Sequence, residues 1–357
     1  MIKTKITELF GIKHPIMLAG MNWITEYKLV SAVSNAGGLG ILATGRFTPG
    51  EIRKQIKEIR ELTDKPFGIN QTLNHPRSKD NVKVAIEEKV PIINYSLGRP
   101  WFIEQVHEYG GKVIGTVAMA RHAVRAEQLG CDVISVTGNE AAAHGADVTS
   151  LILVPIVSSM VKVPLLAAGG FYNGRGLAAA LVLGADAISM GTRFVATKES
   201  DVHENYKQLI LKAAEQDTLY SDRFDGMPGR VLKTKGAEAM MRRKGLPIMG
   251  GLAGVLHVKR MLGLSWRDII TAALEKKTTE YGARGSYNIF QQLRFAGGSI
   301  GQENAIYYGN TTLGFMFAGQ GIGGIQDTPG VSELIERIVA EAEEILGITK
   351  EKIISQR

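Results

Sequence analysis

Eight short apolar or β-branched runs recur along the first 190 residues, at intervals of about twenty to thirty residues, with amphipathic helical stretches between them. Strand and helix alternating in this way predict parallel strand pairing, and closing the sheet gives an α/β fold, the (β/α)8 or TIM barrel. An open doubly wound sheet uses the same local units, but no Gly-x-Gly-x-x-Gly follows the first strand. The predicted strands are residues 15–18, 40–43, 67–70, 91–95, 112–116, 132–136, 164–168 and 186–190.

The alternation stops near residue 217, so we expect three parts: a barrel over 1–217, an appended basic and helical, lid-like region over 218–304, and a C-terminal segment over 305–357. In the appended region, Ser265 and Asp268 have the spacing of a capping box, which predicts a helix that begins at Ser265. In the last part, residues 331–346 place apolar side chains at three- and four-residue spacings. This helix is predicted to pack back onto the barrel.

Composition excludes several classes of protein. The single cysteine, Cys131, rules out a disulfide framework, a multi-thiolate zinc site and an iron–sulfur cluster, and we expect it to be a buried small side chain. Nowhere do 18 uncharged apolar residues run together, and the start has no signal-peptide pattern, so we expect a cytoplasmic enzyme that does not enter membranes. Nothing indicates a nucleic-acid-binding module, although the net charge of +7 favours anionic partners.

Glycines follow the seventh and eighth predicted strands. In barrels the loops at these two positions commonly hold a phosphate, because glycine lets backbone N–H groups approach it. Gly169 and Gly170 end the seventh strand, while Gly191 and Thr192 end the eighth. These residues predict a phosphate site; the alternative is that the glycines only permit a tight turn.

The strand-end motifs resemble, in order and in register, those of the nitronate monooxygenase family, formerly called 2-nitropropane dioxygenases. The resemblance covers residues 10–217 and resumes at 317–320, leaving 220–304 uncovered. Lys198-Glu199-Ser200 with His203 resembles the enoyl-ACP reductase II branch in particular. The motifs are PIMLAGM at 15–21, AVSNAGGLG at 32–40, PFGIN at 66–70, AAGG at 167–170 and MGTRF at 190–194.

The resemblance implies FMN at the mouth of the barrel. It places Ala19, Gly20 and Met21 beside the isoalloxazine ring, with Asn70 hydrogen-bonded to it. Thr137 stands at a flavin-contacting position where the family commonly has glutamate or glutamine. The phosphate would be held by Ala168, Gly169, Gly170, Gly191 and Thr192, and Gly319 and Gln320 would close one side of the site.

His144 is the candidate catalytic residue. It lies in the long loop after the sixth predicted strand, where an imidazole can exchange a proton near neutral pH. The family carries a histidine here between glycines, whereas this chain has Ala142 and Ala143, which predicts a stiffer loop and a narrower pocket. Glu140 in the same loop is either part of the site or a solvated side chain.

Three functions fit these residues. The first is an FMN reductase that takes electrons from NADH or NADPH and reduces an activated double bond, such as a 2-enoyl thioester carried by coenzyme A or acyl carrier protein; a quinone reductase is a variant. The second is a nitronate monooxygenase that oxidises alkyl nitronates with O2. The third is a flavin-free, phosphate-binding isomerase or lyase. The 198–203 stretch favours the first, and a homodimer is compatible with all three.

The appended region is strongly basic. Between residues 223 and 260 the acidic residues are Asp225 and Glu238 alone. Such an excess of cations is either a solvated surface or a surface for an anionic carrier, since guanidinium groups match phosphate oxygens in pairs. The cations are Arg223, Arg230, Lys233, Lys235, Arg242, Arg243, Lys244, Lys259 and Arg260.

Overall fold

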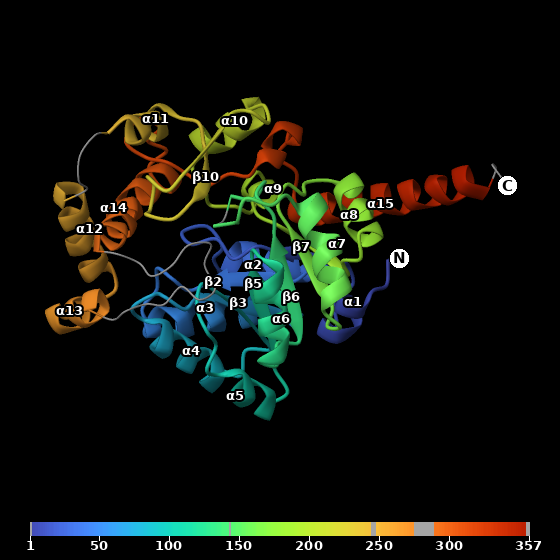
Figure 1. The fold of residues 1–357 in the computed structure, drawn as a ribbon, viewed down its shortest axis with the longest axis horizontal. Helices are drawn as coiled ribbons and strands as arrows, with labels where there is room; N and C mark the ends of the chain where they lie inside the picture. The colour runs from blue at the N-terminus through green and yellow to red at the C-terminus, as the bar shows by residue number, and fades with distance from the viewer. Residues whose placement is uncertain (1, 143, 244–247, 275–288, 355–357) are drawn as a thin grey trace.

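Eight parallel strands form the centre of the molecule in the computed structural model, which describes all residues except 1, 143, 244–247, 275–288 and 355–357 (Figure 1). The strands pair in the order β1-β8-β7-β6-β5-β4-β3-β2. A bridge between Met17 and Leu39 joins the two ends, so the barrel closes and the predicted fold is confirmed. The strands are β1 (Ile16–Leu18), β2 (Gly40–Ala43), β3 (Phe67–Thr72), β4 (Ile92–Ser96), β5 (Lys112–Val117), β6 (Val133–Thr137), β7 (Leu165–Ala168) and β8 (Ala187–Met190).

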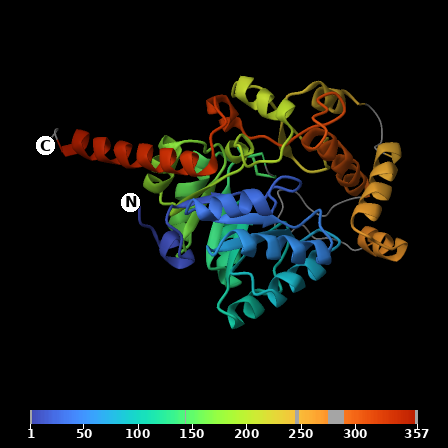
Figure 2. The same ribbon diagram turned by 180° about the vertical axis from the view of Figure 1, so that it is seen from behind.

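Helices cover the outside of the barrel, as both views of the ribbon show (Figures 1 and 2). Helix α3 illustrates why the sequence folds this way: Thr48 and Glu51 form a capping box at its start, and Ile52, Ile56 and Ile59 are buried on one face. The outer helices are α2 (Tyr27–Asn35), α3 (Pro49–Leu62), α4 (Ser78–Glu87), α5 (Ile103–Glu108), α6 (Ala120–Gln128), α7 (Ser150–Met160) and α8 (Gly174–Val182).

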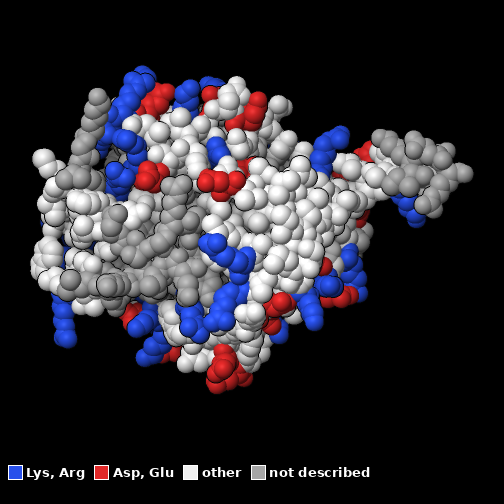
Figure 3. Space-filling model, viewed as in Figure 1, with Lys and Arg blue, Asp and Glu red and all other residues white. Residues whose placement is uncertain are grey.

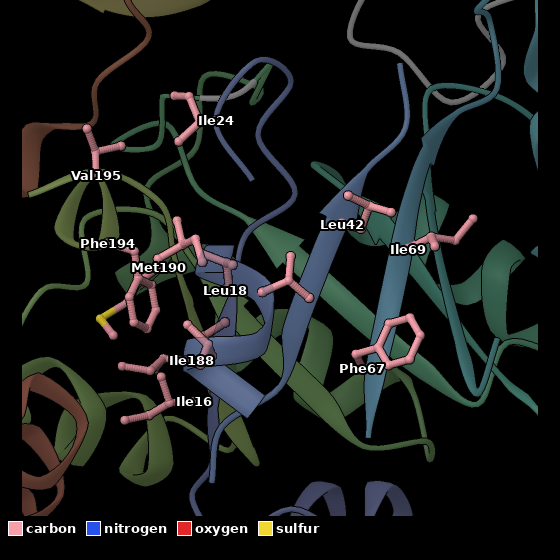
Figure 4. Close-up of a cluster of buried hydrophobic side chains, with 14 of the residues drawn as sticks. Ile16, Leu18, Ile24, Leu42, Phe67, Ile69, Ile188, Met190, Phe194 and Val195 are labelled. Atoms are coloured by element: carbon pink, nitrogen blue, oxygen red, sulfur yellow. The ribbon is translucent and has the colours of Figure 1, made fainter. Parts of the chain in front are cut away.

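Alternate strand residues build two separate cores. Ile16 and Leu18 point outward into the layer between strands and helices, where Figure 4 shows them with other buried side chains. Met17 joins the second cluster, inside the barrel, together with Ile6 and Phe10 of α1 (Lys5–Phe10). The short N-terminal helix therefore closes the amino ends of the strands, which leaves their carboxyl ends for the site.

Cys131 lies between β5 and the helix layer and is 2% exposed. Burial raises the pKa of its thiol to about 11. The residue is therefore a buried, unreactive thiol, as predicted.

The chain beyond β8 adds a hairpin and several helices to the barrel. The hairpin β9 (Thr218–Ser221) and β10 (Gly229–Leu232) is antiparallel, and Val231 bridges to Phe317. Two helices of this region cross closely: a Cβ on Gly254 of α12 would lie 2.3 Å from the Ala296 carbonyl carbon of α14. The added elements are α9 (Thr192–Val195), α10 (Glu204–Lys212), α11 (Lys235–Arg242), α12 (Ile248–Met261), α13 (Trp266–Leu274), α14 (Ile289–Ile306) and η1 (Gln320–Gly324).

The predicted start of α13 is confirmed. The Ser265 hydroxyl and N–H both donate to the Asp268 carboxylate, and the Asp268 N–H donates to Ser265 Oγ. None of the helices in the described ranges is long and apolar enough to cross a membrane.

Helix α15 (Val331–Ile354) packs back onto the barrel beside α8, as predicted, and runs further than the predicted residue 346. The Gly174 N–H at the start of α8 donates to Glu341, and a Cβ on Gly174 would lie 2.5 Å from the Ile338 carbonyl oxygen. Ile335 is fully buried next to Gly38. Figure 1 shows the C-terminal end of α15 projecting from the rest of the molecule.

We expect Ile335→Ala to lower the free energy of unfolding by about 2–5 kcal/mol, because removing a fully buried side chain loses its burial and leaves a cavity. Ile348→Ala on the same helix is the matched control, since Ile348 is 42% exposed. That change should fall within about 0.5 kcal/mol of the parent. Urea unfolding followed by circular dichroism measures both, and equal values would show that α15 adds nothing to the stability of the barrel.

Candidate functional site

A cavity of about 310 Å³ opens at the carboxyl ends of the barrel strands. Its volume lies at the lower end of the usual range for small-molecule sites, roughly 300–1,000 Å³. Uncharged polar side chains from neighbouring strands line it: Asn70, Asn94, Thr116, Ser135, Thr137 and Ser189. This is the end of a parallel barrel at which catalytic sites are built.

Most of the residues singled out in the sequence meet in this cavity. The lining includes Ala19, Gly20, Met21, Asn70, Thr137, His144, Ala168, Gly169, Gly170, Gly191, Thr192 and Gly319. Gln320 is not part of the lining; it begins η1, and its N–H donates to the Glu140 carbonyl oxygen at 2.8 Å. Ala143 lies outside the described residues, so its effect on the width of the pocket stays a prediction.

Gly20 and Gly191 allow the loop after β1 to pack closely against the ends of β3 and β8. A Cβ on Gly20 would lie 2.3 Å from Asn70 Cβ, so only glycine allows the loop to pack against that amide. A Cβ on Gly191 would lie 3.2 Å from the Met21 sulfur. The loop after β1 therefore contacts the ends of both β3 and β8.

The loop after β7 has the shape expected of a phosphate cradle. Gly169 and Gly170 have φ of +114° and +77°, a region that side chains rarely adopt. Thr192 accepts a hydrogen bond from the Gly319 N–H at 3.0 Å, which leaves its own hydroxyl proton to donate. Backbone at close approach and one hydroxyl donor are a set that fits the phosphate of FMN.

Glu140 stabilises the loop after β7 through Ser150 and is absent from the cavity lining. Its carboxylate accepts the Ser150 N–H at 2.9 Å, at the start of α7. The Ser150 hydroxyl lies 3.1 Å from the Gly169 carbonyl oxygen. The structure thus gives Glu140 a structural role that neither of the two sequence interpretations included.

His144 is held by a segment of the appended region. Its Nε2 lies 3.1 Å from Oδ2 of Asp225, and its Nδ1 lies 3.1 Å from the Pro228 carbonyl oxygen. The imidazole ring meets the Phe317 ring edge-on at 5.6 Å. Burial lowers the pKa of His144, but Asp225 and the Pro228 carbonyl outweigh it, so the pKa lies above the ordinary value of 6.5.

The β9–β10 hairpin also fixes the loop that carries His144. Arg230 donates to the Asn139 side chain at 2.8 Å and to the Asn139 carbonyl oxygen at 3.2 Å. The Tyr220 hydroxyl donates to the Gly145 carbonyl oxygen at 3.2 Å. Arg230 is 8% exposed, which corrects its assignment to the basic surface: β10 is covered on this side, so the guanidinium is directed inward.

A second histidine in the lining has a different environment. Arg121 Nε donates to His122 Nε2 at 3.3 Å. Burial and, after it, the charge of Arg121 lower the pKa of His122. Of the histidines that line the cavity, His144 therefore favours the charged form and His122 favours the neutral form. Within the described ranges, no three potential ligands from His, Cys, Asp and Glu gather as a metal site.

The appended region supplies cavity residues that sequence patterns did not identify: Asp225, Met227, Val258, Phe295, Ser299 and Gln302, and Ile306 follows at the end of α14. A signal existed for only one of them. Asp225 is one of two acidic residues in a basic stretch, and an isolated carboxylate of this kind is often paired. The apolar residues on α12 and α14, Val258, Phe295 and Ile306, follow ordinary helical spacing, which does not distinguish a cavity wall from a core.

Comparison with known proteins decides the family. The nitronate monooxygenase family model matches residues 3–102 and 78–341. The chain belongs to the nitronate monooxygenase family. It is accordingly an FMN-dependent oxidoreductase, as the strand-end motifs predicted, and the flavin-free isomerase or lyase is not favoured.

Three relatives place the chain within this family. A CoA-ester dehydrogenase of Mycobacterium tuberculosis, (3aS,4S,5R,7aS)-5-hydroxy-7a-methyl-1-oxo-octahydro-1H-indene-4-carboxyl-CoA dehydrogenase, is 37% identical, with 96% of each chain covered. A probable nitronate monooxygenase of Staphylococcus saprophyticus is 31% identical over 66% of this chain and 79% of its own. The structure of FabK from Thermotoga maritima superposes with a TM-score of 0.79 at 35% identity, over 99% of this chain and all of its own. FabK is the enoyl-ACP reductase II relative that the 198–203 motif indicated.

Proposed function

We propose that the enzyme reduces an activated carbon–carbon double bond in a thioester carried by coenzyme A or acyl carrier protein, with NADH or NADPH as the electron donor. The proposal includes His144 as the proton donor and the predicted glycine and threonine residues as the FMN phosphate site. A cytoplasmic location and a homodimer stay predictions.

One observation carries the thioester assignment. The relative whose name specifies a CoA ester matches 96% of the chain, appended region included, whereas the nitronate monooxygenase matches 66%. The appended region closes the cavity, since Val258 of α12 and Phe295 and Gln302 of α14 line it. A relative that matches the helices lining the cavity is therefore better evidence for the substrate than one that matches a smaller part of the chain.

The residues suit reduction of such a double bond. When bound, FMN supplies the hydride that reaches the β-carbon. Reduction is completed when an acid protonates the α-carbon, and we assign this role to His144, because it lines the cavity and favours its charged form. Phe295, Ile306 and Met227 offer an apolar wall to the acyl group.

Exposed cations suit the anionic part of such a substrate. Figure 3 shows Lys and Arg side chains gathered over α11. Lys233, Lys235, Arg242 and Arg243 are exposed there, while Lys244 lies outside the described residues. Complementary charge of this kind mainly raises the rate of encounter with the phosphates of coenzyme A or the acidic surface of a carrier protein.

The test is an anaerobic titration of the yellow holoenzyme. We expect NADH or NADPH to bleach the flavin absorbance, and a 2-enoyl-CoA then to restore it without oxygen. Bleaching by an alkyl nitronate in the absence of a nicotinamide, together with no recovery on the enoyl thioester, would assign the enzyme to nitronate oxidation instead.

A further inference from the structure

We infer that Asp225 is a positioning residue that keeps His144 protonated, so that the appended region, and not the barrel, sets the charge of the proton donor. The inference rests on the proposed function and adds a residue to it. Asp225 belongs to the turn after β9, far from His144 in the sequence, and it is 2% exposed.

The geometry around the ring favours a cation when Asp225 is ionised. The Asp225 carboxylate and the Pro228 carbonyl oxygen are both acceptors, and each lies 3.1 Å from a different ring nitrogen of His144. A neutral imidazole has one N–H and can donate to only one of them. Both contacts are hydrogen bonds only when both nitrogens carry hydrogen, which is the imidazolium form.

Asp225 is fixed so that this contact is maintained. Its Oδ1 accepts the Met227 N–H at 3.2 Å, which leaves Oδ2 for His144. Helix α14 packs directly on it, since a Cβ on Gly298 would lie 3.2 Å from Asp225 Cβ. A carboxylate held on two sides keeps its orientation, and a charged hydrogen bond in a buried place is stronger than an exposed one.

The other charged and titratable groups near this loop have partners elsewhere. Arg230 donates to Asn139 and to Thr218, and the Tyr220 hydroxyl donates to the Gly145 carbonyl oxygen. Glu140 accepts from Ser150. Within the described part of the chain, Asp225 is therefore the carboxylate that faces the ring, and Phe317 and Gly229 cover its sides.

The consequence for the reaction is that His144, the proposed proton donor, stays protonated at neutral pH. For the transfer, one of the two ring N–H groups turns from its protein acceptor to the substrate α-carbon. That N–H bond breaks, its electron pair stays on the ring, and a C–H bond forms at the α-carbon. The ring becomes neutral and takes up a proton from solvent before the next turnover. Without Asp225, the imidazole of His144 would be neutral in most enzyme molecules at a pH above its ordinary pKa of 6.5.

Asp225→Asn in the holoenzyme tests the inference, with Asp222→Asn as the matched control. Asp222 lies in the same turn but is exposed, and its nearest cation is Arg294 at 4.0 Å. NMR of histidine-labelled protein, assigned by the signal that disappears in His144→Gln, reports the pKa of His144. We expect Asp225→Asn to lower it by about one to three units, the usual effect of one adjacent charge. The control should leave it unchanged.

Kinetics give the second readout. In Asp225→Asn the alkaline limb of kcat should move to lower pH by the same amount as the pKa, with KM little changed and activity recovering toward that of the parent in acid. Asp225→Glu, which keeps the charge, should restore part of the loss. An unchanged pKa, an unchanged pH profile, or a loss of activity that acid does not recover would overturn the inference.

The NMR experiment needs no substrate. A lowered His144 pKa in an enzyme that does not reduce enoyl thioesters would contradict the proposed function while leaving the His144–Asp225 pairing in place. If Asp225→Asn does not fold, the parent enzyme decides: a His144 pKa at or below 6.5 would overturn the inference.

Discussion

Replacing His144 with alanine is expected to lower turnover by about 10²- to 10⁴-fold, the usual worth of a positioned proton donor. Flavin content should stay close to that of the parent, because the imidazole ring contacts Asp225, Pro228 and Phe317 and none of the glycines proposed to hold the phosphate. Stopped-flow measurement of flavin reoxidation by a 2-enoyl-CoA isolates the affected step. The preceding reduction by NAD(P)H should be little changed.

His107→Ala is the matched control. His107 forms the same kind of pair, with Nε2 2.8 Å from Asp132 Oδ2, but it is 39% exposed and lies on α5. Its loss should leave turnover unaltered. Parent-like turnover in His144→Ala would remove His144 from the mechanism.

The same pair makes the stability difference between parent and His144→Ala depend on pH. The folded-state pKa of His144 is raised, so the stabilisation from its pairing is fully present below the unfolded-state pKa of about 6.5. It is lost as the pH rises through the folded-state pKa. Chemical unfolding at several pH values measures this; a difference that grows toward alkaline pH would contradict the raised pKa.

Replacing Gly170 with valine is expected to abolish FMN binding. The residue lines the cavity at φ of +77°, and its Cβ would lie 3.2 Å from Glu140 Cβ. A branched side chain is strained at this φ and presses on Glu140, so the loop has to shift and its backbone N–H groups leave the positions proposed for binding the phosphate. The flavin absorbance of the purified variant, and its recovery on adding free FMN, measure the effect.

Gly110→Val separates strain from loss of the site. Gly110 has φ of +82° with nothing within 4 Å of its Cβ position, and it lies between α5 and β5, at the opposite end of the barrel. The Gly110→Val variant should be less stable than the parent and should still bind FMN. Stoichiometric FMN in Gly170→Val would mean that the phosphate binds elsewhere.

Local patterns predicted the barrel well because the information was local. Each strand is a short apolar run bounded by glycine, proline or polar residues, and the capping residues Thr48 and Ser265 lie within four residues of the groups they bind. The same holds for Gly169 and Gly170, whose positive φ is set by the turn they occupy. Barrel geometry then brings the ends of all eight strands to one place, so the predicted residues share a cavity.

Side-chain partners could not be predicted in this way. Glu140 and Arg230 each had two sequence interpretations that treated them as site or surface residues, and both proved to fix neighbouring loops through Ser150 and Asn139. Whether a polar side chain faces solvent or a buried acceptor depends on what packs over it, and for these two residues the covering elements come from other parts of the chain.

The sequence by itself determined the fold, the end of the barrel that carries the site and the family, since all three follow from the order and spacing of short motifs. Only the tertiary structure decided that Asp225 faces His144 and that α12 and α14 wall the cavity. The physical reason is that these contacts join segments far apart in the chain. They exist because the β9–β10 hairpin and the glycine-lined crossing of α12 and α14 fold over the strand ends.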